Sequence, residues 1–279
     1  MTYRGRIAPT PSGYLHLGHA STFLMAAERA ADGVLVLRNE DLDPQRSKPL
    51  YVDAFLTDLA WLGIVWNEGP DLGGSLGPYA QSMRREYYLR AWRLLKDAGY
   101  IYPCERSRKE IQEAALHAPH GDESLYPKKY RPPSGCIYES EEPSGVNWRF
   151  RVPDGELITF FDELQGPQSY IAGVDFGDFL VWNRDDIPSY ELAVVVDDHA
   201  MGITEVVRGE DVMRSTARQL LLYRALGYEH PLFCHAPLVC DEYGKRLAKR
   251  TKALSLKMLR SEGVTPEDVK GLIAARLKC

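Results

Sequence analysis

One stretch near the N-terminus, residues 6–19 with the sequence RIAPTPSGYLHLGH, constrains the fold most strongly. Arg6 to Ala8 are predicted to end a short strand, and the prolines and glycine that follow exclude regular helix and strand. Helical spacing of apolar residues begins near Gly18 and stops at Gly33. A strand, a tight loop and a helix N-terminus together favour anion binding, because free backbone N–H groups point into the crevice.

Two histidines, His16 and His19, stand at the start of this predicted helix, with Gly18 between them. Gly18 has no Cβ, so a flat ring can lie against the backbone there. An H-x-x-H pair also occurs at ordinary helix ends, and it is one element of many metal sites, but nearby cysteines or further histidines are missing. The strand, the proline-rich loop and the amphipathic helix around the pair favour a binding site.

The composition is that of an ordinary globular protein, with 279 residues, 44% hydrophobic and 26% charged residues, and a net charge of -5. This acidic balance does not by itself predict nucleic-acid binding, so any RNA contact must come from local basic patches. The N-terminus has no apolar segment of signal-peptide type, and no apolar run is long enough for a bilayer. The five irregularly spaced cysteines are predicted to be thiols of a cytoplasmic protein, which we expect to be a monomer.

The order of predicted elements indicates an α/β protein that is interrupted once. A strand at Val34–Leu37 and two amphipathic helices follow the first helix. Proline and glycine then become frequent, and four alternating apolar segments predict the strands of a mixed insertion over roughly residues 100–188. Beyond it, the pattern predicts strands at Leu192–Val196, Ile203–Val207 and Leu232–Cys240, a helix capped at Ser215, and a C-terminal helix from Thr265.

Two groups of residues suited to anions lie near opposite ends of the sequence, the histidine pair and a basic loop that contains Lys249. Both are expected at the carboxyl edge of the sheet, where open α/β sheets bind ligands. Phosphoryl or adenylyl transfer depends on positioning and positive charge more than on a protein nucleophile. The sequence contains neither a Ser-His-Asp arrangement nor a Walker A loop that would support a different mechanism.

These motifs resemble those of the class I aminoacyl-tRNA synthetases. His16-Leu17-Gly18-His19 resembles the HIGH motif, and Arg246-Leu247-Ala248-Lys249-Arg250 resembles the KMSKS loop, with Ala248 in place of the usual serine. The glutamyl branch is the one most similar in three further segments: residues 6–13, residues 38–43, and residues 192–199 followed by Val207-Arg208-Gly209.

The resemblance implies a Rossmann-like catalytic domain with a parallel sheet, split by a mixed α+β insertion. Residues 1–99 would form its first half and residues 100–188 the insertion, which is similar to an acceptor-binding domain. Residues 189–279 would form the second half, with the KMSKS-like loop and a C-terminal helix.

Only residues 251–279 follow the KMSKS-like loop, so no anticodon-binding domain is expected. This organisation resembles the glutamyl-Q tRNA(Asp) synthetases, which activate glutamate without tRNA and attach it to the queuosine base of tRNA(Asp). One alternative is a truncated glutamyl-tRNA synthetase that charges a tRNA 3′ end. Others are a non-catalytic paralogue that binds nucleotide or RNA, and an adenylyltransferase for another acid; the presence of His16 and Lys249 argues against the paralogue.

Residue roles follow from the same resemblance. It implies that ATP is bound by His16, Gly18, His19, Arg246 and Lys249, and that His16, His19 and Lys249 are the catalytic residues. It also implies a glutamate pocket, in which guanidinium groups suit carboxylates and a carboxylate suits the substrate ammonium. This pocket comprises Arg6, Ile7, Ala8, Pro9, Thr10, Glu40, Tyr190 and Arg208. Mg²⁺ is expected to arrive with ATP rather than in a protein site.

The insertion departs from the family at a position where zinc is often bound. The matching residues are Cys104, Arg106, Tyr126 and Tyr130, a poor ligand set for zinc, and the spacing of Cys136 does not fit. We therefore predict no bound zinc. The basic residues of the insertion either contact tRNA or form a solvated face; they are Arg106, Arg108, Lys109, Lys128, Lys129 and Arg131.

Overall fold

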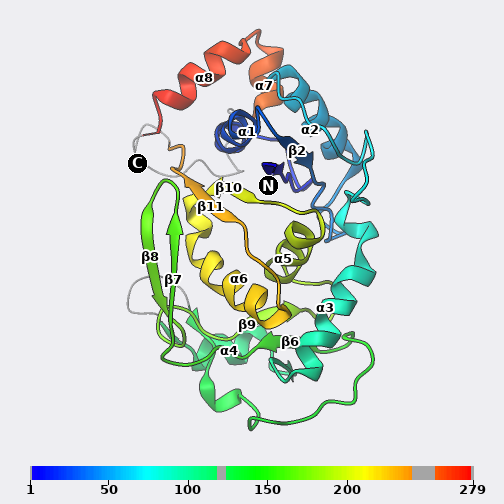
Figure 1. The fold of residues 1–279 in the computed structure, drawn as a ribbon, viewed down its shortest axis with the longest axis vertical. Helices are drawn as coiled ribbons and strands as arrows, with labels where there is room; N and C mark the ends of the chain where they lie inside the picture. Colours follow the sequence, from blue (N-terminus) through cyan, green and yellow to red (C-terminus); the bar gives the residue numbers. More distant parts are fainter. Residues whose placement is uncertain (1, 118–123, 241–254, 278–279) are drawn as a thin grey trace.

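The computed structural model of the chain describes residues 2–117, 124–240 and 255–277. Strands and helices alternate in its first third (Figure 1). The elements there are β1 (Arg4–Ile7), α1 (Leu17–Arg29), β2 (Val34–Leu37), α2 (Pro49–Trp61), the short 3₁₀ helix η1 (Gln81–Met83) and α3 (Arg85–Asp97).

Short strands dominate the middle of the chain. They are β3 (Ile101–Cys104), β4 (Leu116–His117), β5 (Ser124–Leu125), β6 (Asn147–Phe150), β7 (Leu157–Asp162), β8 (Gly166–Ile171) and β9 (Phe179–Trp182). Two short helices accompany them, α4 (Arg108–Ala114) and η2 (Lys128–Tyr130).

The last third returns to strands and longer helices. It contains α5 (Tyr190–Ala200), β10 (Glu205–Gly209), η3 (Glu210–Val212), α6 (Met213–Leu226), β11 (Leu232–Ala236), α7 (Leu256–Ser261) and α8 (Pro266–Ala274).

Parallel strands from the two ends of the sequence lie side by side. β1 pairs with β2, and β10 pairs with β11. The two pairs meet where the backbone N–H of Thr204 donates to the carbonyl oxygen of Arg4 at 2.9 Å, and where the Arg6 guanidinium donates to the carbonyl oxygen of Val207 at 2.8 Å. The predicted α/β class with a parallel sheet is therefore confirmed.

The β7–β8 hairpin continues the sheet beyond β11. β7 pairs in parallel with β11 through Phe233 and Asp162, and in antiparallel with β8. The remaining longer strands of the middle region form a separate antiparallel sheet in the order β3-β6-β9. The sequence-based boundaries of the insertion stay a prediction.

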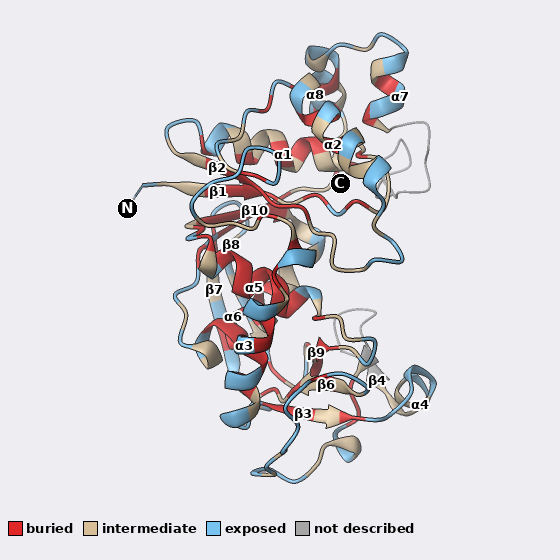
Figure 2. Cartoon of the chain, turned by 90° about the vertical axis from the view of Figure 1, so that its right-hand side faces the viewer, coloured by how far each residue is buried: buried red, intermediate tan, exposed pale blue. Residues whose placement is uncertain are grey.

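Side chains alternate across the central strands into two hydrophobic cores, one on each face of the sheet. Leu35, Leu37 and Cys234 belong to the core under α1, α2, α7 and α8. Val36 and Phe233, their immediate neighbours, belong to the core formed with α3, α5 and α6. Figure 2 shows these strands as a buried layer between two groups of helices. Both faces are covered, as expected for parallel strands.

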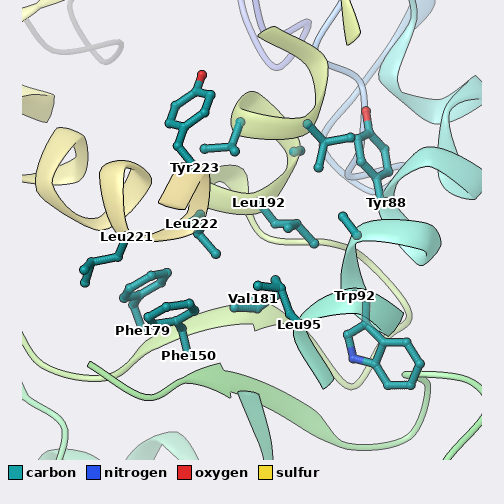
Figure 3. Packing of buried hydrophobic residues seen from close by; sticks show 14 of the residues in the cluster. Tyr88, Trp92, Leu95, Phe150, Phe179, Val181, Leu192, Leu221, Leu222 and Tyr223 are labelled. Atoms are coloured by element: carbon teal, nitrogen blue, oxygen red, sulfur yellow. The ribbon is translucent and has the colours of Figure 1, made fainter. Parts of the chain in front are cut away.

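The larger core connects the central sheet to the antiparallel sheet β3-β6-β9. In Figure 3, Leu95 of α3 lies beside Val181 of β9, Leu222 of α6 points toward the same strand, and Trp92 of α3 lies at the right. Phe150 of β6 lies beside Phe179 of β9 at the left. Trp92 is fully buried, as are Val181 and Leu222. Burying large apolar side chains in this way stabilises the fold by roughly 1.5–3 kcal/mol for each.

Four predicted elements are wrong in type or boundary. Leu192–Val196 lies in helix α5 rather than in a strand, because α5 is buried on every side and its apolar run therefore lacks helical spacing. The helix predicted to be capped at Ser215 begins earlier, at Met213, because η3 leads directly into α6. The last strand ends at Ala236, and α8 ends at Ala274 rather than at the end of the chain.

The cysteines also differ from expectation. Cys104, Cys136 and Cys234 are free thiols, but Cys240 is disulfide-bonded, so the prediction of thiols throughout is wrong for Cys240. Spacing along a sequence does not report distance in space, which is what decides whether a disulfide can form. Among the described residues, no helix combines the length and the apolar character needed to cross a bilayer.

Candidate active site

The two histidines form the N-terminal cap of α1. The Nδ1 atom of His16 accepts from the backbone N–H of Gly18 at 3.1 Å. The Nδ1 atom of His19 accepts from the backbone N–H of His16 at 3.2 Å. This reciprocal capping box, with imidazoles in place of the usual hydroxyl and carboxylate, fixes both rings, whose centroids lie 3.9 Å apart.

These hydrogen bonds determine what each histidine can offer a ligand. A backbone N–H can only donate, so Nδ1 is the acceptor nitrogen in both rings, and the ring hydrogen is on Nε2. Each imidazole can therefore donate Nε2–H to an anionic oxygen, beside the positive end of a 13-residue helix. This is the arrangement that phosphate binding requires.

Gly18 is closely approached by the first of these rings. A Cβ built at Gly18 would lie 3.0 Å from Cε1 of His16, tighter than ordinary van der Waals contact. The absent side chain therefore lets His16 keep its capping position and keeps the helix mouth open.

The segment that follows the basic loop is attached to this helix mouth. Ser255 forms a β-bridge with His16, and the backbone N–H of Leu256 donates to the carbonyl oxygen of Leu15 at 2.8 Å. The Nζ atom of Lys257 donates to the hydroxyl of Tyr14 at 3.0 Å. Arg246 and Lys249 themselves lie outside the described residues.

A buried group of charges occupies the carboxyl ends of β1 and β2. Arg38, fully buried, donates to Asp198 at 2.5 Å and to Glu40 at 3.1 Å. Nε of Arg6 lies 3.5 Å from the same Asp198 carboxylate. Burial raises the pKa of Glu40, although Arg38 and Arg6 oppose the shift. Burial likewise lowers the pKa of Arg6, against the attraction of Asp198.

Arg208 of β10 completes this group from the other parallel pair. Its guanidinium donates to Nε2 of His235 at 3.0 Å, to the hydroxyl of Thr216 at 2.7 Å and to the hydroxyl of Tyr190 at 3.4 Å. The positive charge of Arg208 also lowers the pKa of Arg6, after burial and alongside Arg38, which places the two guanidinium groups in one electrostatic environment.

The structure thus brings together four of the residues predicted for the glutamate pocket, Arg6, Glu40, Tyr190 and Arg208. The remaining four lie at the end of β1 and in the loop after it, and contribute differently. The side chain of Ile7 is fully buried in the apolar core, and the backbone carbonyl oxygen of Ile7 accepts from the backbone N–H of Arg38 at 2.9 Å. The carbonyl oxygen of Pro9 accepts from the backbone N–H of Glu40 at 3.0 Å. Ala8 is half-buried and Thr10 is exposed.

The side chains that hold these residues were given no role from the sequence. Arg38 and Asp198 lie in the segments 38–43 and 192–199 that resemble the glutamyl branch, and His235 lies in the predicted last strand. The sequence did offer one signal, which is a charged or imidazole side chain inside an apolar run. Such a group is buried only when it is paired, so its position predicts a buried partner.

The residues at the family's zinc position do not fit a zinc site. Sγ of Cys104 lies 3.1 Å from the hydroxyl of Tyr126, and the Arg106 guanidinium lies 4.9 Å from the centre of the Tyr130 ring. One thiol, two phenols and a guanidinium lack the thiolates and imidazoles that zinc requires. The described residues contain no group of three or more His, Cys, Asp or Glu side chains able to hold a metal ion.

Comparison with known proteins agrees with this geometry. Residues 2–276 match the family described as "tRNA synthetases class I (E and Q), catalytic domain". The chain belongs to this family. A class I catalytic domain accounts for the capped histidine pair at a helix N-terminus and for the parallel sheet, and it confirms the predicted Rossmann-like fold.

Two curated relatives of this class I family are similar over 97% of the chain and 85% of their own length, and both are named glutamyl-Q tRNA(Asp) synthetase. The one from Symbiobacterium thermophilum is 47% identical, and the one from Nitratidesulfovibrio vulgaris is 44% identical. A glutamate–tRNA ligase from Sulfurihydrogenibium is 40% identical over 95% of the chain but only 56% of its own length.

Solved structures of class I synthetases share the fold. The glutamate-tRNA synthetase from Elizabethkingia anophelis superposes with a TM-score of 0.76 at 31% identity, over 90% of this chain. This chain spans about half of that protein, 53% of its length. A methionyl-tRNA synthetase from Mycobacterium tuberculosis, at 13% identity and a TM-score of 0.57, supports the fold alone.

Proposed function

We propose that this protein is a ligase that activates L-glutamate with ATP, without tRNA, and transfers the glutamate to the queuosine base of tRNA(Asp). In the first step an oxygen of the glutamate α-carboxylate attacks the α-phosphorus of ATP, and pyrophosphate leaves. In the second step a hydroxyl of the queuosine ring attacks the mixed anhydride, and AMP leaves.

The observation that carries the proposal is the similarity to two glutamyl-Q tRNA(Asp) synthetases at 44–47% identity over nearly the whole chain. The glutamate–tRNA ligases are less similar, at 40% identity or below, and match over little more than half of their length. The higher identity and the greater coverage of the relatives' length therefore favour the queuosine-modifying branch over the alternative of charging a tRNA 3′ end.

The charge arrangement of the pocket supports an amino acid substrate with a second carboxylate. Arg208 forms no ion pair with any carboxylate of the described residues, although it is only 7% exposed. A buried guanidinium with neutral partners retains its attraction for a ligand carboxylate. Glu40, with its side chain 10% exposed, supplies the negative charge for the substrate ammonium.

The N-terminus of α1 supports the roles proposed for its residues in ATP binding. His16 and His19 would donate Nε2–H to phosphate oxygens, and Gly18 would leave room for the adenine. Lys249, with Arg246 beside it, would stabilise the charge that builds on the phosphates in the transition state. Lys249 lies six residues before Ser255 in the sequence, and Ser255 pairs with His16.

The experiment that tests the proposal is glutamate-dependent ATP–pyrophosphate exchange in the absence of tRNA. We expect exchange with L-glutamate, and at least about 100-fold less with L-glutamine, whose amide cannot pair with the Arg208 charge. Absence of exchange with every amino acid would favour the non-catalytic paralogue. Exchange that requires added tRNA would favour a truncated glutamyl-tRNA synthetase.

The basic residues of the insertion differ in whether they are available to bind tRNA. Arg131 forms ion pairs with Asp154 and Asp178 and is largely buried, so its role is structural. The exposed Arg108, Lys109 and Lys129 are better candidates for phosphate contacts.

We also propose, as expected from the sequence, that Mg²⁺ is bound with ATP, that no zinc is held, and that the protein is a cytoplasmic monomer.

A further inference from the structure

The guanidinium of Arg208 is held by neutral groups, which sets it apart from the other buried arginines of the site. Arg38 contacts Asp198 and Glu40, and Arg84 contacts Asp197 at 2.6 Å. The partners of Arg208 are instead an imidazole and two hydroxyl groups. Its orientation is thus fixed without neutralising its charge, and the imidazole of His235 is the partner that accepts from Nε.

His235 is in turn held by Asp162, from the β7–β8 hairpin. Nδ1 of His235 lies 2.6 Å from Oδ2 of Asp162, and the backbone N–H of His235 donates to the same carboxylate. The backbone N–H groups of Leu164 and Gln165 donate to Oδ1 of Asp162. Both Asp162 and His235 are fully buried. The three side chains lie on adjacent strands, β7, β11 and β10, with Arg208 directly opposite His235 in the ladder.

The two partners of His235, Arg208 and Asp162, determine which ring nitrogen carries the hydrogen. A guanidinium can only donate, so Nε2 of His235 accepts, and an ionised carboxylate can only accept, so Nδ1 carries the hydrogen. Burial and the positive charge of Arg208 lower the pKa of His235 to about 4, although the hydrogen bond that His235 donates to Asp162 opposes this. Burial raises the pKa of Asp162, but the hydrogen bonds from His235 and the backbone outweigh it and keep that pKa below its usual value.

We propose that Asp162 and His235 are positioning residues that orient the Arg208 guanidinium toward the substrate carboxylate, so that the β7–β8 hairpin sets the affinity for the amino acid. Neither residue touches the reacting atoms. The hairpin acts through a carboxylate–imidazole–guanidinium chain, in which the neutral imidazole transmits orientation while the carboxylate stays too far from Arg208 to neutralise it. This inference rests on the proposed role of Arg208 in binding glutamate.

Substitutions at His235 can break the hydrogen bonds that link Asp162 to Arg208, or restore them. In His235→Phe the side chain keeps an aromatic ring but can neither accept from Arg208 nor donate to Asp162. In His235→Gln the amide can do both without a charge, because its carbonyl oxygen accepts and its N–H donates. We expect the KM for glutamate in the exchange reaction to rise about 10-fold or more in His235→Phe and to stay within about 3-fold of wild type in His235→Gln. The KM for ATP should change less than about 2-fold in both.

A merely structural role for His235 would raise the KM for both substrates together or leave His235→Gln no better than His235→Phe, and either result would overturn the proposal. An unchanged KM for glutamate in folded His235→Phe would also overturn it. If wild-type protein shows no exchange at all, the proposed function fails. The hydrogen-bonded arrangement of Asp162, His235 and Arg208 is then tested by a measurement that needs no activity.

That measurement is ¹⁵N NMR of the histidine rings in the wild-type protein. The His235 signals are assigned by their absence in His235→Gln. The groups that face His235 are Asp162 from β7, Arg208 from β10 and Thr216 from α6, with the charge of Arg6 on β1 beyond them. We expect Nδ1 to carry the hydrogen and Nε2 to stay unprotonated between about pH 6 and 8. A ring protonated at Nε2, or one that titrates near its ordinary pKa, would overturn the proposal.

Discussion

The backbone N–H of Leu256 donates to the carbonyl oxygen of Leu15 at 2.8 Å, and this bond fixes the end of the basic loop beside the histidine pair. Because Leu15 directly precedes His16, Ser255 and Leu256 lie at the start of α1 although they are more than 200 residues away in sequence. The first predictions concern the groups at this mouth.

Replacing His16 or Lys249 should remove a donor to the transition state. We expect His16→Ala and Lys249→Ala each to lower glutamate-dependent exchange by about 100-fold or more. His16→Asn serves as the matched variant, because asparagine restores a helix cap but offers no group in the place of Nε2–H. Lys270→Ala, which removes an exposed lysine of α8, controls for charge. Near-wild-type exchange in both His16→Asn and Lys249→Ala would refute the assigned roles.

Adding a methyl group at Gly18 should disturb ATP binding. The new Cβ would lie 3.0 Å from Cε1 of His16 and push its ring out of the capping position. We expect Gly18→Ala to raise the KM for ATP about 10-fold, with little change in the KM for glutamate. In Gly271→Ala of α8, the new Cβ has no atom within 4 Å, so that variant should stabilise the helix and leave both constants unchanged. Equal kinetics in the two variants would show that the space at Gly18 is not used.

Affinity for glutamate should fall in mild acid. Burial raises the pKa of Glu40 above its ordinary value of 4.5. The carboxylate must be ionised to attract the substrate ammonium, so binding is complete above this raised pKa and is lost as the pH falls through it. The KM for glutamate should rise as the pH falls from neutral toward the ordinary value of 4.5, and Glu40→Gln should abolish that dependence while weakening binding at every pH. A KM for glutamate that is flat over this range in wild type would contradict the role of Glu40.

The protein should carry no zinc when it is purified without chelators. Cys104 is the only thiol among the four residues at the family's zinc position, and its Sγ contacts the Tyr126 hydroxyl. Elemental analysis should therefore find less than about 0.1 equivalent of zinc, and a chelator should leave the unfolding temperature unchanged. A tightly bound equivalent of zinc, lost together with stability on chelation, would require ligands beyond those described.

Local signals in the sequence correctly predicted many elements, whereas the residues of the glutamate pocket came from the family resemblance. The Thr265-Pro266 start of α8 is an example, since Thr265 caps the helix and Asp268 completes the capping box. The strand Val34–Leu37 was predicted with the bounds that β2 has, because a short apolar run that begins directly after Gly33 is typical of a buried strand.

The failures have physical causes. Helix α5 is buried on both sides, so the apolar run Leu192–Val196 shows no helical period and resembles a buried strand. Helix α4 has no buried residue and was missed, although Ser107 and Glu110 form a capping box. The partners of Arg208 could not be found either, because Asp162 and His235 meet only through strand pairing across 73 residues.

The central claim is that glutamate is attached to the queuosine nucleotide of tRNA(Asp). The direct measurement uses radiolabelled glutamate, ATP, tRNA(Glu) and two tRNA(Asp) preparations, one with queuosine and one without, followed by nuclease digestion to identify the nucleotide that carries the label. We expect label only in the queuosine-containing tRNA(Asp), on the queuosine nucleotide. Label on the 3′-terminal adenosine of tRNA(Glu), with none on queuosine, would contradict the account.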